Sequence, residues 1–219
     1  MLGRSILIVE DEALLRELLA HTLETRGFLV TTAASAADAK RIFAQIDPDA
    51  LVLDVDLGRG PNGFDVAESI RLQAPHVGIV FLTNLPDQRF ATVEPEKLPK
   101  GIAYLRKSAL TNVDLLIDAL DAVLRGQGTD SYRQDRDAHR PLGNLTRKQI
   151  QVLQLVSQGK TNSQIAQERG VSVKAIEDTI GRLCVALGID SSEEGNVRVA
   201  AVRQLLNIRS VPDQYDESL

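Results

Sequence analysis

The sequence predicts an α/β domain with a doubly wound, five-stranded parallel sheet, followed by a small all-α domain of four helices. Three observations support this fold class. Short apolar runs alternate with longer amphipathic runs over residues 1–125, a polar stretch follows, and from Leu145 onward the apolar pattern is purely helical. The 219 residues suffice for two domains, each able to bury a core.

The strands of the first domain are predicted from apolar runs of strand length that end at turn or acidic residues. They cover residues 6–9, 28–32, 50–53, 78–82 and 102–105. Because amphipathic runs separate them, the strands are expected to be parallel and covered by helices on both faces.

The helices of the first domain follow the helical spacing of apolar residues. They are predicted over residues 14–23, with a stop near Gly27, and over residues 36–46, 64–72 and 113–124. Residues 85–100 include Pro86, Pro95 and Pro99, so any helix in this segment is expected to be short or irregular.

The second domain is expected after a linker. Residues 126–144 are rich in Gly, Asp, Arg and Gln, which is typical of a flexible segment. Helices are then predicted over residues 146–156, 161–168, 172–187 and 193–206. The chain therefore divides into a domain at 1–125, a linker at 126–144, a domain at 145–210 and a disordered tail at 211–219.

Composition excludes several classes of protein. The single cysteine, Cys184, excludes an internal disulfide framework, and no run approaches the roughly 18 apolar residues of a membrane span. The N-terminus leads directly into a strand and does not resemble a signal peptide. We therefore expect a soluble, cytoplasmic protein without a membrane partner.

The net charge is −5, but residues 145–210 hold 9 basic and 6 acidic residues, which is compatible with nucleic-acid binding there.

Acidic residues follow two of the predicted strands. Glu10 and Asp11 come after the first strand, and Asp54 and Asp56 come after the third. Ligands of open parallel sheets bind at the carboxyl edge, and carboxylates that converge there repel one another unless a cation neutralises them. Oxygen ligands suit Mg²⁺, which often binds together with a phosphoryl group.

A hydroxyl and an ammonium group are expected at the same edge. Thr83 follows the fourth strand and Lys107 the fifth, and both could stabilise charge on a phosphoryl group. Across nearly all of residues 4–125, the ordered series Glu10-Asp11, Asp54, Thr83, Lys107 resembles the receiver domain of two-component response regulators.

The resemblance implies a flavodoxin-like fold and a role for each matching residue. Asp54 would accept a phosphoryl group, Lys107 would pair with its oxygens and Thr83 would move to hydrogen-bond them. Tyr104 matches the switch aromatic of the family. The implied Mg²⁺ ligands are Asp11 and Asp54 directly, Glu10 through water, and the carbonyl group of Asp56.

The first domain also departs from the family pattern. The loop 55–63 is longer than usual, Asp56 adds a carboxylate, and Asn84 replaces a small residue. Glu10 with the Asp54-x-Asp56 pair also resembles the metal-binding set of toprim nucleases and topoisomerases. That Mg²⁺-dependent nuclease is the alternative from a different class, and it leaves Thr83 and Lys107 unexplained.

The second domain has the pattern of a helix-turn-helix, because a short turn at residues 168–171 joins two predicted helices. Residues 145–206 resemble the LuxR/NarL-type DNA-binding domain. The motif residues that support the resemblance are Leu145-Thr146, Val152-Leu153, Gly159, Asn162, Ile165-Ala166 and Ser172. The resemblance implies that the third helix enters the major groove. The residues that it places near DNA are Lys160, Thr161, Asn162, Lys174, Glu177, Asp178 and Arg182.

This domain departs from its family as well. Glu177 stands where a lysine is usual and Thr179 where a histidine is usual, while Gln149 and Gln151 replace acidic residues. A degenerate helix-turn-helix that binds protein is therefore a second alternative.

The expected function is that of a two-component response regulator and transcription factor, not an enzyme. A sensor histidine kinase would phosphorylate Asp54 with Mg²⁺ as cofactor. Phosphorylation would promote a homodimer that binds a double-stranded DNA promoter.

Overall fold

The computed structural model describes residues 3–91, 100–189 and 197–209. The chain forms two compact units, Met1–Asp137 and Ala138–Leu219. None of the helices described is long and apolar enough to cross a membrane. The tail predicted at 211–219 lies outside the described residues.

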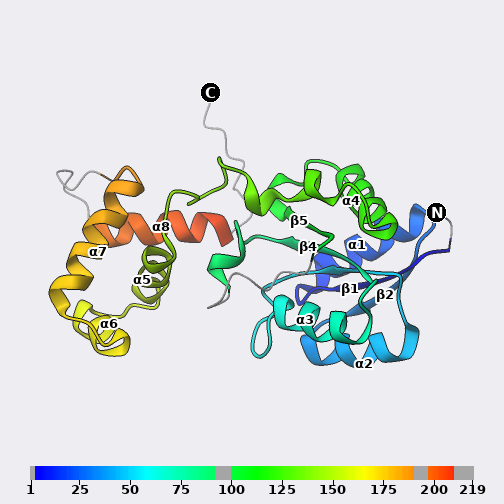
Figure 1. The fold of residues 1–219 in the computed structure, drawn as a ribbon, viewed down its shortest axis with the longest axis horizontal. Helices are drawn as coiled ribbons and strands as arrows, with labels where there is room; N and C mark the ends of the chain where they lie inside the picture. The colour runs from blue at the N-terminus through cyan, green and yellow to red at the C-terminus, as the bar shows by residue number, and fades with distance from the viewer. Residues whose placement is uncertain (1–2, 92–99, 190–196, 210–219) are drawn as a thin grey trace. The chain divides into compact units, whose positions relative to one another are not determined.

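The first unit is built on a five-stranded, all-parallel sheet of order β2-β1-β3-β4-β5 (Figure 1). Its strands are β1 (Ser5–Val9), β2 (Leu29–Ala33), β3 (Ala50–Leu53), β4 (Gly78–Thr83) and β5 (Ile102–Arg106). The strand order reverses direction at β1 and β3, so the sheet is doubly wound as predicted. The register pairs Val9 with Leu53 and Leu53 with Phe81, which aligns the carboxyl ends of three strands.

Helices cover both faces of this sheet. They are α1 (Ala13–Thr25), α2 (Ala36–Ile46), α3 (Gly63–Gln73) and α4 (Asp114–Arg125). Leu23 of α1 and Leu120 of α4 pack against Ile6 and Ile8 of β1 in one buried cluster. Helices α2 and α3 contact each other and lie on the opposite face (Figure 1). The predicted strands and helices agree closely with these bounds.

The segment after β4 is irregular where it is described, as its prolines predict. It forms one short 3₁₀ helix, η1 (Gln88–Phe90), in which the Asp87 side chain accepts a hydrogen bond from the Arg89 amide. Residues 92–99 lie outside the described part of the chain.

The segment after α4 corrects the linker prediction. Residues 129–137, which we call the strap, contain the 3₁₀ helices η4 (Thr129–Tyr132) and η5 (Gln134–Arg136) and belong to the first unit. Arg133 forms a parallel bridge with Tyr104 of β5, and the Arg106 amide donates to Gln134 Oε1 at 2.8 Å. The strap therefore covers an edge strand that would otherwise present unpaired backbone groups.

Polar contacts fix the strap in place. Arg133 Nε and Nη2 donate to the two oxygens of Asp135 at 2.8 and 2.7 Å, and Asp135 is buried while Arg133 is half-buried. Arg106 Nη2 lies 3.6 Å from Asp137 Oδ2, and Tyr132 packs against the core beneath. The strap is ordered although its composition is typical of linkers. The two Arg–Asp pairs and the edge of β5 hold it in place, and these contacts cannot be recognised from the local sequence.

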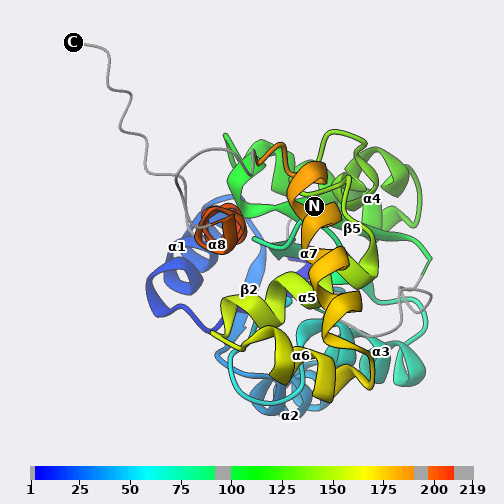
Figure 2. The same cartoon turned by 90° about the vertical axis from the view of Figure 1, so that its left-hand side faces the viewer.

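The second unit contains four described helices, α5 (Arg147–Ser157), α6 (Asn162–Arg169), α7 (Val173–Ala186) and α8 (Val197–Arg209). Helix α7 contacts both α5 and α6 (Figure 2). Thr146, Thr161 and Ser172 cap α5, α6 and α7 through side-chain hydrogen bonds, as the sequence predicts. Gly170, at φ +63°, ends α6 and allows the tight turn into α7.

Candidate functional site

The acidic residues of the first unit meet at the carboxyl edge of the sheet. Glu10 and Asp11 follow β1, and Asp54 follows the adjacent β3, where its amide donates to the Val9 carbonyl at 2.9 Å. One carboxylate oxygen from each of Glu10, Asp11 and Asp54 lies within 4.8 Å of the others. Glu10 and Asp54 are buried and Asp11 is exposed. The site is therefore a buried acidic pair with one side open to solvent.

Lys107 compensates the buried pair. Its Nζ lies 2.6 Å from Asp54 Oδ2 and 2.7 Å from Glu10 Oε2. Burial and the neighbouring Asp54 charge raise the pKa of Glu10. Burial alone would lower the pKa of Lys107, but Asp54 and Glu10 raise it above its ordinary value. Lys107 is thus held in its charged form between two carboxylates.

These residues fit a divalent cation. Glu10, Asp11 and Asp54 offer only carboxylate oxygens, the hard donors that Mg²⁺ prefers. Asp56 is exposed and lies outside this carboxylate cluster, but its amide donates to Asp54 Oδ1 at 3.1 Å. The role assigned to the Asp56 carbonyl remains a prediction.

Thr83 and Tyr104 share a partner close to this edge. Thr83, the last residue of β4, is fully buried and accepts a hydrogen bond from the Leu85 amide at 3.4 Å. Tyr104 is also fully buried, and its hydroxyl donates to the Leu85 carbonyl at 2.9 Å. Burial, followed by the charge of Asp135 in the strap, raises the pKa of Tyr104 well above its ordinary value. The two residues matched to the family's switch are thus connected through Leu85.

Gly63 is a site residue that the sequence analysis missed. A Cβ atom at this position would lie 2.1 Å from the Asp54 carbonyl oxygen, and the Gly63 amide donates to Val55 at 2.9 Å. Asn62 and Asp65 form a capping box around Gly63 at the start of α3. The adjacent Asn62-Gly63 pair before an apolar run was the available signal. Gly63 allows α3 to begin directly against the backbone of Asp54.

The residues predicted to face DNA fall into two groups. Several already have partners within the second unit. Lys160 forms an ion pair with Glu168, Lys174 Nζ lies 3.3 Å from Asp178 Oδ1, and the Thr161 side chain caps α6. The side chain of Asn162 accepts a hydrogen bond from Arg198. Glu177 and Arg182 are exposed on α7.

Together, these observations define a class of protein. A doubly wound parallel sheet places an acidic cluster, a lysine and a buried threonine at one edge, and a helix-turn-helix unit follows. This is the architecture of a response regulator: a receiver that takes a phosphoryl group and an output domain that binds DNA.

Comparison with known families agrees with this class. Residues 6–96 match the response regulator receiver domain, and residues 143–194 match the bacterial regulatory proteins of the luxR family. The chain belongs to the response regulators with a LuxR-type DNA-binding domain.

Individual relatives cover one domain or both. The oxygen regulatory protein NreC of Staphylococcus aureus is 25% identical over 206 residues, which span 86% of this chain and 93% of NreC. The crystal structure of a LuxR-family two-component response regulator from Aurantimonas sp. SI85-9A1 is 27% identical, covers 61% of this chain and 94% of its own, and has a TM-score of 0.51. RcsB of Salmonella enterica, bound to a promoter, shares the fold at 19% identity and a TM-score of 0.56, covering 93% and 98% of the two chains.

Proposed function

We propose that Asp54 accepts a phosphoryl group from a sensor histidine kinase and that this modification controls promoter binding by the second unit. The observation that supports this most directly is the contact of Lys107 with both Asp54 and Glu10 beside the open side at Asp11. A nucleophilic carboxylate, a fixed cation and a place for a metal ion are the groups that phosphoryl transfer to a carboxylate requires.

The chain's own residues position the reacting carboxylate. The Asp56 amide holds Asp54 Oδ1 and Lys107 holds Asp54 Oδ2, so the orientation of the carboxylate is set by both contacts. In the proposed transfer, one Asp54 oxygen forms the new bond to phosphorus as the bond from phosphorus to the kinase histidine breaks. Mg²⁺, held by Glu10, Asp11, Asp54 and the Asp56 carbonyl, would offset the negative charge of both partners.

The switch follows from the shared contact at Leu85. We propose that Thr83 exchanges its bond from the Leu85 amide for one to the phosphoryl group, as the family resemblance implies. Because the Tyr104 hydroxyl donates to the Leu85 carbonyl, a change at Thr83 reaches Tyr104. The backbone of Tyr104 in turn pairs with Arg133 of the strap. This route ends at the segment that leads into the second unit.

The proposed output is a phosphorylation-dependent homodimer on DNA. A helix-turn-helix protein that reads two half-sites gains affinity when two copies bind together. RcsB, which shares this fold, is bound to its promoter in the presence of a phosphoryl mimic, beryllofluoride. A Mg²⁺-dependent nuclease is disfavoured, because it would leave the contacts of Lys107 and Thr83 without a role.

Intact-protein mass spectrometry tests the phosphoryl acceptor. Incubation with acetyl phosphate and Mg²⁺ should add the mass of one phosphoryl group. Asp54→Ala should abolish the added mass, whereas Asp65→Asn, a nearby carboxylate in the α3 cap, should keep it. An unchanged adduct in Asp54→Ala would rule out Asp54 as the acceptor.

A further inference from the structure

We propose that Lys148, Arg169 and Arg182 form a binding site for a DNA backbone phosphodiester beside α7. The inference rests on the proposed DNA binding and identifies which cations of the second unit provide it. Lys148 and Arg169 are absent from the residues that the sequence analysis placed near DNA.

The three cations line one hollow. It has a volume of about 300 Å³, and its side chains come from α5 (Lys148), the end of α6 (Arg169) and α7 (Arg182). Val152 and Ile176, which also line the hollow, are buried residues of the core. Asp178, which pairs with Lys174, borders the hollow as well, so three cations and one carboxylate surround it. The site is therefore held by three packed helices and has a net positive charge.

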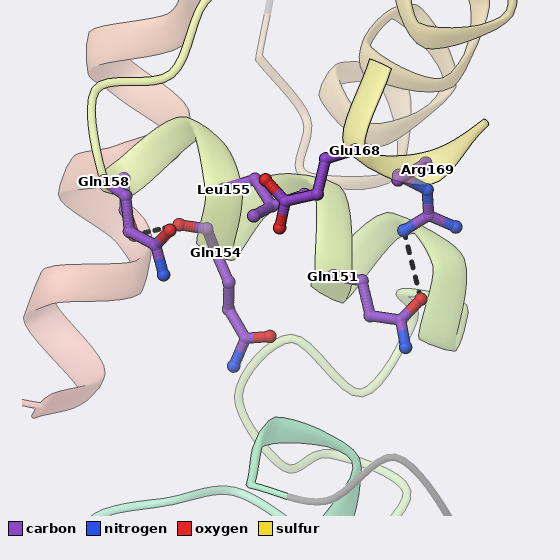
Figure 3. A pocket seen from close by; sticks show the side chains of 7 residues that line it. Gln151, Gln154, Leu155, Gln158, Glu168 and Arg169 are labelled. Carbon is purple, nitrogen blue, oxygen red and sulfur yellow. Dashed lines mark hydrogen bonds between the residues drawn. The ribbon is translucent and has the colours of Figure 1, made fainter. Parts of the chain in front are cut away.

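The two arginines are oriented by neutral groups. Arg169 Nη1 donates to Gln151 Oε1 at 3.0 Å, where Arg169 also borders a second hollow (Figure 3). Arg182 Nη2 donates to the Thr179 hydroxyl at 3.3 Å. A guanidinium has five N–H donors, so each arginine is oriented while most of its donors and its whole charge remain available.

Charge pairing separates these cations from the others on the surface. Within the part of the chain that the structure describes, no carboxylate forms an ion pair with Lys148, Arg169 or Arg182. Lys160 and Lys174, in contrast, are paired with Glu168 and Asp178. A paired lysine must give up its carboxylate partner to bind a phosphate, which lowers its net contribution to DNA binding.

The neutral charge of the two acceptors explains why these arginines stay available. A carboxylate at position 151 would form an ion pair with Arg169 and offset its charge. Gln151 supplies the same hydrogen bond without the charge. The Thr179 hydroxyl likewise gives Arg182 a neutral acceptor.

The location suits a phosphodiester of the DNA backbone. When a helix lies in the major groove, groups on the neighbouring helices contact the phosphates that flank the groove. The hollow joins α7 to the start of α5 and the end of α6, so a bound phosphate would fix α7 relative to the groove. Glu177 of α7, which does not line the hollow, can then contact base edges while the phosphate is held from the side.

The salt dependence of DNA binding tests the proposal. The full chain, activated with beryllofluoride and Mg²⁺, is titrated with a duplex enriched from genomic fragments and with a random duplex, at several salt concentrations. Lys148→Ala and Arg169→Ala should each reduce the log–log salt slope by up to about 0.9, the contribution of one phosphate contact, on both duplexes. Arg203→Ala, which removes an exposed cation on α8, is the matched control and should leave the slope unchanged. Thermal unfolding verifies that each variant is folded.

Gln151→Glu is the sharper variant because it keeps the length of the side chain and an acceptor oxygen in the same position, and adds only a negative charge. It should weaken binding to both duplexes as much as Arg169→Ala, since an ion pair then occupies the guanidinium. Combining the two substitutions should add little beyond Arg169→Ala alone. If Gln151→Glu, Lys148→Ala and Arg169→Ala all bind with the wild-type slope, the proposed site is wrong and the proposed function stands.

Two other outcomes would also overturn the proposal. If the activated wild-type chain enriches no DNA sequence and binds no random duplex, the proposed function fails and this site with it. If inorganic phosphate, added to the protein without DNA, gives saturable NMR shifts that Arg169→Ala abolishes, the hollow is a site for free phosphate. Shifts no larger than those from chloride at equal ionic strength support the DNA phosphodiester.

Discussion

Lys107 of the receiver and Arg169 of the DNA-binding unit are both long cations fixed by hydrogen bonds, but their partners differ in charge. Lys107 lies between two buried carboxylates, whereas Arg169 is held by the neutral amide of Gln151. The first arrangement stabilises the buried acidic site at which we propose that a phosphoryl group binds. The second keeps a positive charge available for an external anion. The partner of a cation, more than its exposure, therefore decides what the cation can bind.

Lys107→Ala is expected to have the largest effect, because it leaves Glu10 and Asp54 buried without a cation. Removing one member of a buried ion pair costs about 3–5 kcal/mol, and activation by phosphoryl donors should be lost. Chemical denaturation without divalent ions measures the cost, and Mg²⁺ should restore more stability to this variant than to the wild type.

The control for this variant is Lys100→Ala, which removes an exposed lysine ahead of β5 and should be neutral. A Lys107→Ala protein of wild-type stability that still signals would show that the buried carboxylates do not depend on this lysine.

Arg133→Ala extends the comparison to the strap. The variant leaves Asp135 buried and unpaired, which should cost about 1–3 kcal/mol of folding stability. Arg125→Ala removes an exposed arginine that lies 3.7 Å from Asp121, and such surface pairs contribute about 0–1 kcal/mol. Equal unfolding free energies for the two variants would contradict an ordered strap.

Gly63→Ala tests the close contact at the phosphoryl acceptor. The added methyl group would collide with the Asp54 carbonyl, so we expect a loss of about 1–3 kcal/mol and slower phosphorylation from acetyl phosphate. Gly181→Ala is the matched substitution in α7, where a Cβ meets open space, and should stabilise that helix by up to about 1 kcal/mol. Opposite signs in the two unfolding curves are the expected result.

Asp178→Asn should produce the smallest effect on stability. The exposed pair with Lys174 contributes about 0.3–0.5 kcal/mol, so unfolding will change little. Freeing Lys174 should instead steepen the salt slope of DNA binding by up to about 0.9. A slope that does not change would indicate that Lys174 does not face a phosphate.

Periodic and strand-end features could be predicted from the sequence, whereas tertiary pairing could not. The helix at 36–46 and the strand at 50–53 were correct because apolar spacing and burial coincide there. The meeting of Glu10, Asp11 and Asp54 followed from parallel strand ends. The strap was missed because Arg133 and Asp135 look like linker residues until the β5 edge lies beside them.

The same limit applied to the DNA-binding unit. The spacing of Lys174 and Asp178 could have revealed their pairing, since residues four apart share a helix face. The pairing of Arg169 with Gln151 joins two helices and has no signature in local sequence.

The strap also determines where the receiver can be separated from the rest of the chain. A fragment that ends at Arg125 would uncover the backbone groups of β5, an edge strand with the buried apolar residues Ala103 and Leu105. Exposed edges of this kind recruit other strands, so such a fragment should self-associate without any phosphoryl group. A fragment that ends at Asp137 keeps its own cover and should stay monomeric in light scattering. Dimerisation measured on the shorter piece would then reflect the cut and not the signal.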